Sequence, residues 1–572
     1  MTSKIWKKVL RESPAYSWNY SLKSIRAIRF IDEIYDSTIV IPELYTNSHM
    51  KYIKSCSKVR LVLIGNRKHK SFQRIARFSC RFHKTIKEAQ YTLKRTRFLR
   101  FYPFSSITKC KITFEQGNKE ALSNEDLKVF RKALTSSKLE KISIDCLEKR
   151  TITFLRRFSH LKALNLRTSL ENFLAHQQAV NRTYFENRKN DLELFLFLTT
   201  DNDKKVSNSL NRSLKLATHI RSLGLQVEGH SRIPDFWENA GQLVNLSKFS
   251  YTETDNPFSN NPLKNLQDLN NLTRLDFMFN LSHSSQNFLI IFASLPLSVS
   301  LRELTLTFHN INTDVSGNPT LYLANLERLS TLQNLRKFGL KITLHKIVSK
   351  EVQSRYVSAV TKALENLREG LEDLKIDLSD FTLEESPLID KGSDIVELIL
   401  RQHKLKSLEV RLPIVFEKPK SETRIMPEFF NIKTLVLKDC QGFADSLLKY
   451  NFRTLEHFTF TPGRSYDTGE ACSVIRAIKF LTNLRKIEFV VTIKEKQNLT
   501  NDLFEEIKNT FKNLKYLTTM HICLSNLNVT EAQAMSTLSL IRWKRSLRAS
   551  SIKLGQYSFH RGAFDLSGLF YF

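Results

Sequence analysis

The chain has 572 residues, a formal net charge of +31 and 41% hydrophobic residues, enough apolar material for a long core. Its 15 glycines and 13 prolines exclude the collagen-like and the Pro/Gly-rich disordered classes. No run approaches the roughly 18 consecutive apolar residues that indicate a membrane span. We therefore expect a folded, strongly basic protein with no membrane span.

The first part of the chain, residues 1–58, shows no repeat and is predicted to be an N-terminal cap or non-repeat segment. Met1 to Arg11 holds four cations and no acid, a composition that mitochondrial transit peptides share. The tract is short, and Asp32, Glu33 and Asp36 follow it closely. A cap is therefore the favoured interpretation, and a mitochondrial leader is the alternative.

About half of the positive charge lies in the next segment. Residues 51–100 contain 16 Lys or Arg and a single acid, Glu88. Cations recur there at steps of three and four, and Phe and Ile form a second stripe, as on an amphipathic helix with a cationic face. Residues 59–106 are therefore assigned to a basic amphipathic helix region, with a degenerate first strand near Val59. The cations predicted to bind a polyanion are Arg67, Lys70, Arg74, Arg77, Arg81, Lys84, Lys87, Arg95 and Arg97.

Three interpretations of this basic segment stay open. Binding to a polyanion, most simply RNA phosphates, would release counterions and make the affinity depend steeply on salt. Alternatively, the helix packs on the first strands through its Phe/Ile stripe, and the cations are only its solvated side. The third interpretation is binding to an acidic protein or to a membrane surface.

From residue 107 to residue 560 the pattern L-x-x-L-x-L recurs, most clearly at Leu161-Leu164-Leu166 and Leu301-Leu304-Leu306. The average step is about 29 residues, within the range of leucine-rich repeats. Residues 561–572 are left as a C-terminal tail. The first residues of the successive copies are Ile107, Leu139, Leu161, Leu192, Ile220, Leu246, Leu272, Leu301, Leu335, Leu371, Leu405, Ile432, Leu455, Leu484, Leu514 and Leu547.

The pattern has a physical reason. Alternate residues of a strand point to opposite faces, so the fourth and sixth residues of each copy point together into a core. Segments between the copies show helical spacing, as in Leu127, Phe130 and Leu134, and again in 357–371 and 501–514. The predicted fold class is therefore α/β: a solenoid curved as a horseshoe, with parallel strands on the concave face and helices on the convex face.

These repeats resemble leucine-rich repeats of the long, ribonuclease-inhibitor-like subclass over residues 107–560, about four fifths of the chain. In that family the motif continues to a ninth residue, Asn or Cys, whose side chain bonds the turn backbone. Only Asn280 and Cys440 match it here. The resemblance implies a protein-binding solenoid, and the departure implies an irregular hydrogen-bonded ladder with uneven curvature.

Hydrolytic motifs are missing from the sequence, which has neither G-x-S-x-G nor H-E-x-x-H. The 14 histidines are scattered, and structural roles are expected for His230, His309 and His457. No catalytic residue, metal, cofactor or small-molecule substrate is predicted, so we expect a protein that is not an enzyme. Seven dispersed cysteines without a C-x-x-C pair favour reduced thiols and an intracellular location, cytoplasmic or nuclear.

The predicted function is a scaffold that binds a macromolecular partner, with a protein partner expected first and RNA or another polyanion second. One alternative is an RNA-associated ribonucleoprotein component. Another is a substrate adaptor of a ubiquitin ligase, although residues 1–50 show no clear helical adaptor-binding module. The residues predicted to contact the partner from the concave face are Asn165, Arg167, Thr305, Thr307, Lys375, Asp377, Glu409 and Arg411.

Overall fold

The computed structural model divides the chain into two compact units, residues 1–250 and 251–572, which are described separately. The residues that the structure describes are 19–21, 38–41, 58–63, 88–93, 108–114, 139–144, 163–169, 191–198, 220–227, 243–253, 269–280, 300–311, 329, 332–344, 360, 361, 364, 365, 367, 370–378, 398, 402, 404–411, 431–439, 452, 454–543, 546, 547 and 549–561.

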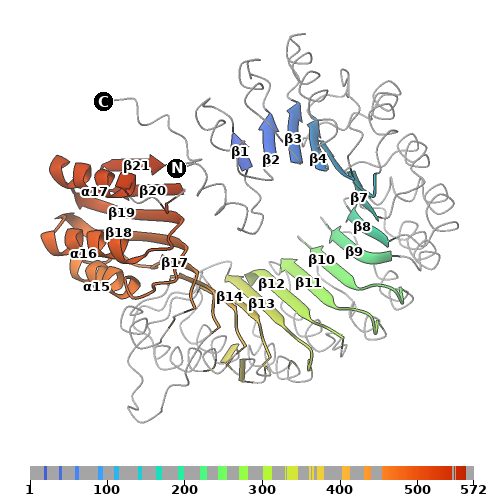
Figure 1. The fold of residues 1–572 in the computed structure, drawn as a ribbon. Coiled ribbons are helices and arrows are strands. Elements are labelled where there is room, and N and C mark those ends of the chain that lie inside the picture. The colour runs from blue at the N-terminus through green and yellow to red at the C-terminus, as the bar shows by residue number, and fades with distance from the viewer. Residues whose placement is uncertain are drawn as a thin grey trace, which may run out of the picture. The chain divides into compact units, whose positions relative to one another are not determined.

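The first unit contains parallel strands that pair in chain order, each with the next (Figure 1). Parallel pairing begins at β1, within the segment expected to be a cap, and β3 coincides with the predicted degenerate strand near Val59. The predicted domain bounds stay predictions. The strands are β1 (Asn19–Ser21), β2 (Thr38–Ile41), β3 (Lys58–Leu63), β4 (Glu88–Leu93), β5 (Lys109–Phe114), β6 (Lys141–Ile144), β7 (Ala163–Ser169), β8 (Asp191–Leu198) and β9 (Ile220–Val227).

The second unit repeats this arrangement, since each strand from β11 to β19 pairs in parallel with the next. The strand β10 (Lys248–Glu253) spans the boundary between the units. The strands of the second unit are β11 (Arg274–Asn280), β12 (Glu303–Ile311), β13 (Lys337–Leu344), β14 (Asp373–Asp377), β15 (Ser407–Arg411), β16 (Thr434–Lys438), β17 (His457–Thr461), β18 (Lys486–Asn498), β19 (Thr519–Asn528), β20 (Ala549–Leu554) and β21 (Tyr557–Arg561).

The strand register confirms the predicted leucine-rich repeat. We number each copy from position 1 at its first leucine, so that positions 4 and 6 are the predicted inward residues. The pairing aligns Leu275 with Leu304 and Phe277 with Leu306, which are positions 4 and 6 of neighbouring copies, and all four side chains are buried. Each such side chain contributes about 1.5–3 kcal/mol through burial. The chain is thus a solenoid of stacked parallel strands that share an apolar core within each unit.

One predicted first residue is wrong by three positions. In β19, Met520 pairs with Ile487 at position 4, which makes Leu517 the first residue in place of Leu514. A second leucine, three residues ahead of the true first residue of β19, caused this mistake. The position of Leu192 differs between its two neighbours: it pairs with Leu164, at position 4 of β7, and with Ile220, at position 1 of the next copy, and the register shifts directly after it.

A tight turn ahead of the strands explains that second leucine. The N–H of a position-1 residue donates to the carbonyl three residues earlier, as from Leu246 to Leu243 (2.8 Å) and from Leu484 to Leu481 (3.0 Å). The residues at both ends of these turns are buried. The repeating unit is therefore L-x-x-L-x-x-L-x-L, three residues longer at its start than the predicted one.

The hydrogen-bonded ladder is regular where the strands begin. The position-2 carbonyl of one copy accepts two N–H groups of the next copy, those at positions 2 and 3. Arg302 O thus accepts from Arg336 (2.8 Å) and from Lys337 (2.9 Å). Toward the strand ends the register shifts, after Phe308 on β12 and after Thr492 on β18, which stands at position 9. The ladder is therefore irregular near the ninth position, as the missing Asn or Cys led us to expect.

Among the described residues of the second unit, three helices follow strands: α15 (Thr468–Ile478), α16 (Asn501–Asn513) and α17 (Glu531–Trp543). Figure 1 shows them side by side along one side of the strands. The predicted helical stripe of 501–514 is confirmed, because Phe504, Ile507, Phe511 and Leu514 are all buried. In 357–371, Val360, Leu364, Leu367 and Leu371 are buried too, whereas the segment with Leu127 lies outside the described residues.

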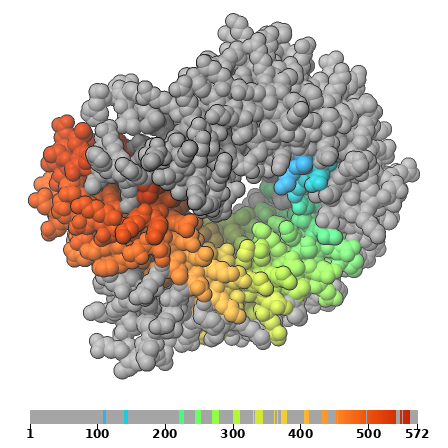
Figure 2. Space-filling model, in the orientation of Figure 1, coloured from blue at the N-terminus to red at the C-terminus, as the bar shows by residue number. Residues whose placement is uncertain are grey.

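The strand β21 is antiparallel to β20 and ends the series of strands in this unit. The turn between them contains Gly555, whose φ of +54° is left-handed and whose N–H donates to Leu524 O (2.8 Å). A Cβ at this residue would collide with the carbonyl of Leu527. The sharp turn therefore requires glycine. In Figure 2 the described residues of the second unit form one continuous coloured surface from yellow-green to red.

Candidate interaction surface

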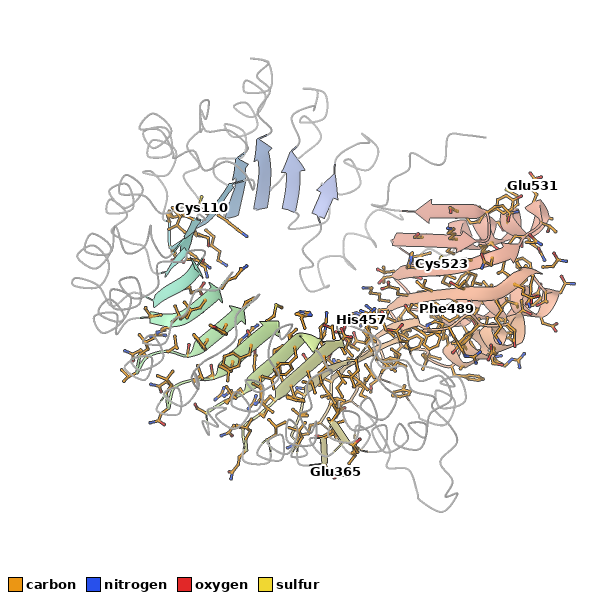
Figure 3. All side chains as sticks on the ribbon, turned by 180° about the vertical axis from the view of Figure 1, so that it is seen from behind. Cys110, Glu365, His457, Phe489, Cys523 and Glu531 are labelled. Atoms are coloured by element: carbon orange, nitrogen blue, oxygen red, sulfur yellow. The ribbon has the colours of Figure 1, made fainter. Side chains whose placement is uncertain are left out.

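The exposed face of the strands is built by the register. Because the strands are parallel and aligned, residues at the same position of successive copies form a row that runs across the strands, with about 4.8 Å between neighbours. Positions 4 and 6 form the buried rows, and positions 2, 3, 5 and 7 form the rows that face solvent. Figure 3 shows side chains of both kinds of row along the strands. Among those labelled, Phe489 on β18 belongs to buried row 6, whereas His457 on β17 and Cys523 on β19 belong to rows 3 and 7.

Rows 5 and 7 contain most of the predicted contact residues, and the structure brings several of them together. Lys375 and Glu409 are aligned on β14 and β15, and Lys375 Nζ donates to Glu409 Oε2 (2.9 Å). Arg411 Nε donates to Asp439 Oδ2 (2.9 Å), and Asp377 lies 3.9 Å from Lys341 Nζ. Two predicted residues thus pair with each other, and Arg411 and Asp377 pair with Asp439 and Lys341, which the sequence did not single out.

The other predicted contact residues differ in exposure. Thr305 is exposed on β12, whereas Thr307, two residues later on the same strand, is buried. In the first unit Asn165 is half-buried, and its Nδ2 donates to Glu193 Oε2 (3.4 Å), which also accepts from Lys141 Nζ (2.7 Å). Arg167 occupies position 7 of β7. The described contact residues therefore lie on the predicted face, but Thr307 and Asp377 are both buried and offer little surface to a partner.

The predicted polyanion-binding residues lie outside the described residues. Arg67, Lys70, Arg74, Arg77, Arg81, Lys84, Lys87, Arg95 and Arg97 fall in the intervals that flank β3 and β4. Their assignment to a cationic helix face stays a prediction.

Rows 2 and 3 carry a feature that sequence reasoning missed. In three places one glutamate lies between two cations from the flanking strands: Glu372 between Arg336 (3.5 Å) and Lys406 (2.7 Å), Glu456 between Lys433 (3.4 Å) and Arg485 (3.4 Å), and Glu303 between Arg274 (3.4 Å) and Lys337 (3.1 Å). We call these units the charge triads. The triads of Glu372 and Glu456 each leave one positive charge unbalanced, whereas in the triad of Glu303 a second acid, Asp276, also pairs with Arg274 (2.7 Å).

The charges of the triads shift nearby pKa values. The hydrogen bond from Lys406 lowers the pKa of Glu372, and the charges of Lys406, Arg336 and Lys337 lower it further. His457, at position 3 of β17, has a lowered pKa, mainly because burial penalises its charged form; Lys486 and Arg485 add to this effect while Glu456 opposes it. Glu372 therefore stays ionised near neutral pH, and His457 is mostly neutral there.

The turn at 462–467 is tied into the fold. The guanidinium of Arg464 lies 5.1 Å from the ring centre of Tyr466, which is buried, and pairs with Glu470. Glu470 and Asp467 form a capping box at the start of α15. Arg464 is thereby held in place by contacts within the fold.

Other chemical features of the described residues are structural. Burial raises the pKa of the Cys110 thiol to about 12, which fits its inward place at position 4 of β5, and Cys110, Cys472 and Cys523 are free. His309 Nδ1 lies 3.0 Å from Thr343 Oγ1. Among the described residues, no group of His, Cys, Asp and Glu is arranged to hold a metal ion. Within the same part of the chain, no helix combines the length and apolar character of a membrane span.

Comparisons with known proteins are sparse. No protein-family model and no curated protein matches the sequence. Similar solved structures include an internalin of Listeria monocytogenes, with 12% identity over 61% of this chain and 83% of that one and a TM-score of 0.30. Another is the TLR13–ssRNA13 complex, with 12% identity over 96% of this chain and 86% of that one and a TM-score of 0.31. The fold rests on the strand register and not on these similarities.

Proposed function

We propose that this protein is a non-enzymatic scaffold that binds a macromolecular partner through the exposed rows of its strands. The observation that supports this most is the alignment of polar and charged side chains on one face across successive strands, β11 to β19. Such a face presents an extended surface, which suits a large partner better than a small molecule. We also propose an intracellular location.

We also propose that these repeats are of the ribonuclease-inhibitor-like subclass. Its support is the repeat step of about 29 residues, together with the helices α15, α16 and α17, which occupy the segments between successive strands.

A protein partner is the first expectation, because rows 5 and 7 are balanced in charge and partly apolar. From β11 to β19 these rows contain four Lys or Arg and four Asp or Glu, all of them described. Met278, Val436 and Val490 lie among them. Apolar contacts within a polar surround are typical of protein interfaces.

The experiment compares partner capture by the full-length protein and by a charge-swapped variant, K375E/E409K. The swap keeps the ion pair between residues 375 and 409 but exchanges the positions of the two charges. The fold should therefore persist while the surface changes. Quantitative mass spectrometry of captured proteins at high salt should show partners lost from this variant. The control is Lys512→Glu on α16, an exposed helix position that should leave capture unchanged. Equal capture by all three proteins would remove rows 5 and 7 from the proposal.

A ribonucleoprotein role is the second candidate, favoured by the net charge of +31 and by the concentration of cations in 51–100. It predicts that nuclease and high salt release the captured partners. It also predicts that substitution of Arg74, Arg77 and Arg81 by Ala abolishes their binding. Partners that survive nuclease and high salt would favour the protein-binding role.

A further inference from the structure

The rows at the start of the strands differ from the rest of the exposed face. From β11 to β19, positions 2 and 3 contain eight Lys or Arg, four Asp or Glu and six Thr, Ser or His, all within the described residues. We call these two rows the basic rim. It contains no apolar residue and carries a net charge of +4, whereas rows 5 and 7 over the same strands balance to zero.

The cations of the rim project further into solvent than its acids. The side chains of Arg336, Lys406 and Lys433 are 60%, 57% and 61% exposed, against 32% for Glu372 and 30% for Glu456. Each glutamate thus lies beneath two cations, fixes their positions and neutralises one of them. Arg302 and Lys486 add two exposed cations that form no ion pair within the described residues.

The rim also runs across a continuous series of neighbouring strands. Position 2 carries a cation on β12, β13, β15, β16 and β18, and the paired carbonyl ladder holds these strands in line. At about 4.8 Å per strand, the six steps from β12 to β18 span about 29 Å. A line of cations of this length matches a partner that carries regularly repeated negative charge.

We propose that the basic rim binds the phosphate backbone of a nucleic acid, without regard to its bases. Lys and Arg neutralise the phosphates, and the Thr and Ser hydroxyls of the same rows can donate to phosphate oxygens. The rim offers no aromatic ring other than that of His457 for stacking on a base, so the contacts fix position and not sequence. This inference rests on the proposed function, in which the same strand face is the interaction surface.

The composition of the rim favours nucleic acid over an acidic protein. Protein interfaces concentrate their affinity in buried aromatic and apolar anchors, and the rim has none. Binding that depends on cations alone is the mode by which proteins hold nucleic acid without sequence preference.

The test measures binding of a fluorescent 20-nucleotide poly(U) RNA to the full-length protein at several salt concentrations. The starting protein carries Arg74→Gln, Arg77→Gln and Arg81→Gln, so that the predicted cationic helix contributes less. The rim variant adds R336Q, K406Q and K433Q. The matched control adds K494Q, K512Q and K515Q, which remove the same charge from exposed positions outside the rim.

Each lost phosphate contact on a single strand reduces the salt slope by about 0.7 and, at 0.1 M salt, the affinity by about 5-fold. Because glutamates already neutralise part of the rim, we expect the rim variant to bind at least about tenfold more weakly at 0.1 M salt. We expect the control variant to bind within about twofold of the starting protein, and poly(dT) of equal length to bind like poly(U).

Equal weakening in both variants would overturn the proposal, because net charge alone would then explain binding, and so would the absence of binding by the starting protein. Equally tight, rim-dependent binding of polyglutamate of matched charge would overturn the commitment to nucleic acid. The rim variant leaves rows 5 and 7 intact, and K375E/E409K leaves the rim intact. Partner capture by K375E/E409K therefore tests the proposed scaffold independently of the rim.

Discussion

Single carboxylates held between two cations recur along the exposed face of the second unit. Their cations are about half exposed or more, so solvent and salt screen these pairs and each contributes little to stability. The triads around Glu303, Glu372 and Glu456 therefore matter more for where the cations stand than for whether the protein folds. The stability comes from rows 4 and 6, where Leu275, Phe277 and their aligned neighbours are buried.

His457 gives a pH-dependent prediction at this scale. Burial lowers its pKa in the folded protein below the ordinary value of about 6.5. A group whose pKa is lowered on folding binds its proton more tightly in the unfolded chain, so it favours unfolding as the pH falls through 6.5. In the NMR titration of the histidine ring protons, the resonance that disappears in His457→Gln should titrate below 6.5. A midpoint at or above 6.5 would contradict the described environment.

Residue identity alone limited the sequence reasoning in a specific way. Inward positions were predictable because they need an apolar side chain, and Cys110 was correctly placed among them. The first residue of a copy was not predictable where leucines stand at more than one suitable spacing, as at Leu192 and Leu514. Only the pairing between strands decides between such alternatives, and it joins residues that lie far apart in the sequence.

At the scale of elements, the helices and the final hairpin follow from different signals. The helix α16 was predictable because Phe504, Ile507 and Phe511 recur at helical spacing. The antiparallel pairing of β20 and β21 was not predicted, although only Gly555 and Gln556 separate the two strands. A two-residue connection of this kind joins antiparallel strands, whereas parallel strands need a longer crossover.

The hairpin provides a stability prediction. Gly555→Ala should destabilise the protein by at least about 1–2 kcal/mol, the cost of a left-handed conformation for a residue with a Cβ. The collision of that Cβ with the Leu527 carbonyl adds to the cost. Urea unfolding of the full-length protein should show a lower midpoint for the transition that involves the hairpin.

Gly370→Ala is the matched control for the hairpin. A Cβ at Gly370 would meet its nearest atom, Leu335 O, at 4.0 Å, which is ordinary van der Waals contact. This variant should unfold at nearly the wild-type midpoint. Equal midpoints for the two variants would show that the hairpin turn does not require glycine.

At the scale of the whole molecule, repetition was the most predictable property and the surface was the least. Copies of one motif at steps of about 29 residues predict stacked units, because a single strand cannot bury its apolar face alone. The rows depend on which residue of one copy stands beside which residue of the next. Variable steps between copies hide that alignment, so the triads and the basic rim were visible only once the register was known.

The register itself is the central claim, and disulfide trapping tests it most directly. Lys375 and Glu409 are aligned neighbours on β14 and β15, so their Cα atoms should lie about 4.8 Å apart, within disulfide range. Lys375 and Arg411 are offset by two residues, which places their Cα atoms about 8 Å apart, beyond that range. Under mild oxidation, peptide mapping should find the 375–409 disulfide in K375C/E409C and no 375–411 disulfide in K375C/R411C. Cross-linking of the offset pair but not of the aligned pair would contradict the parallel register from which every row has been derived.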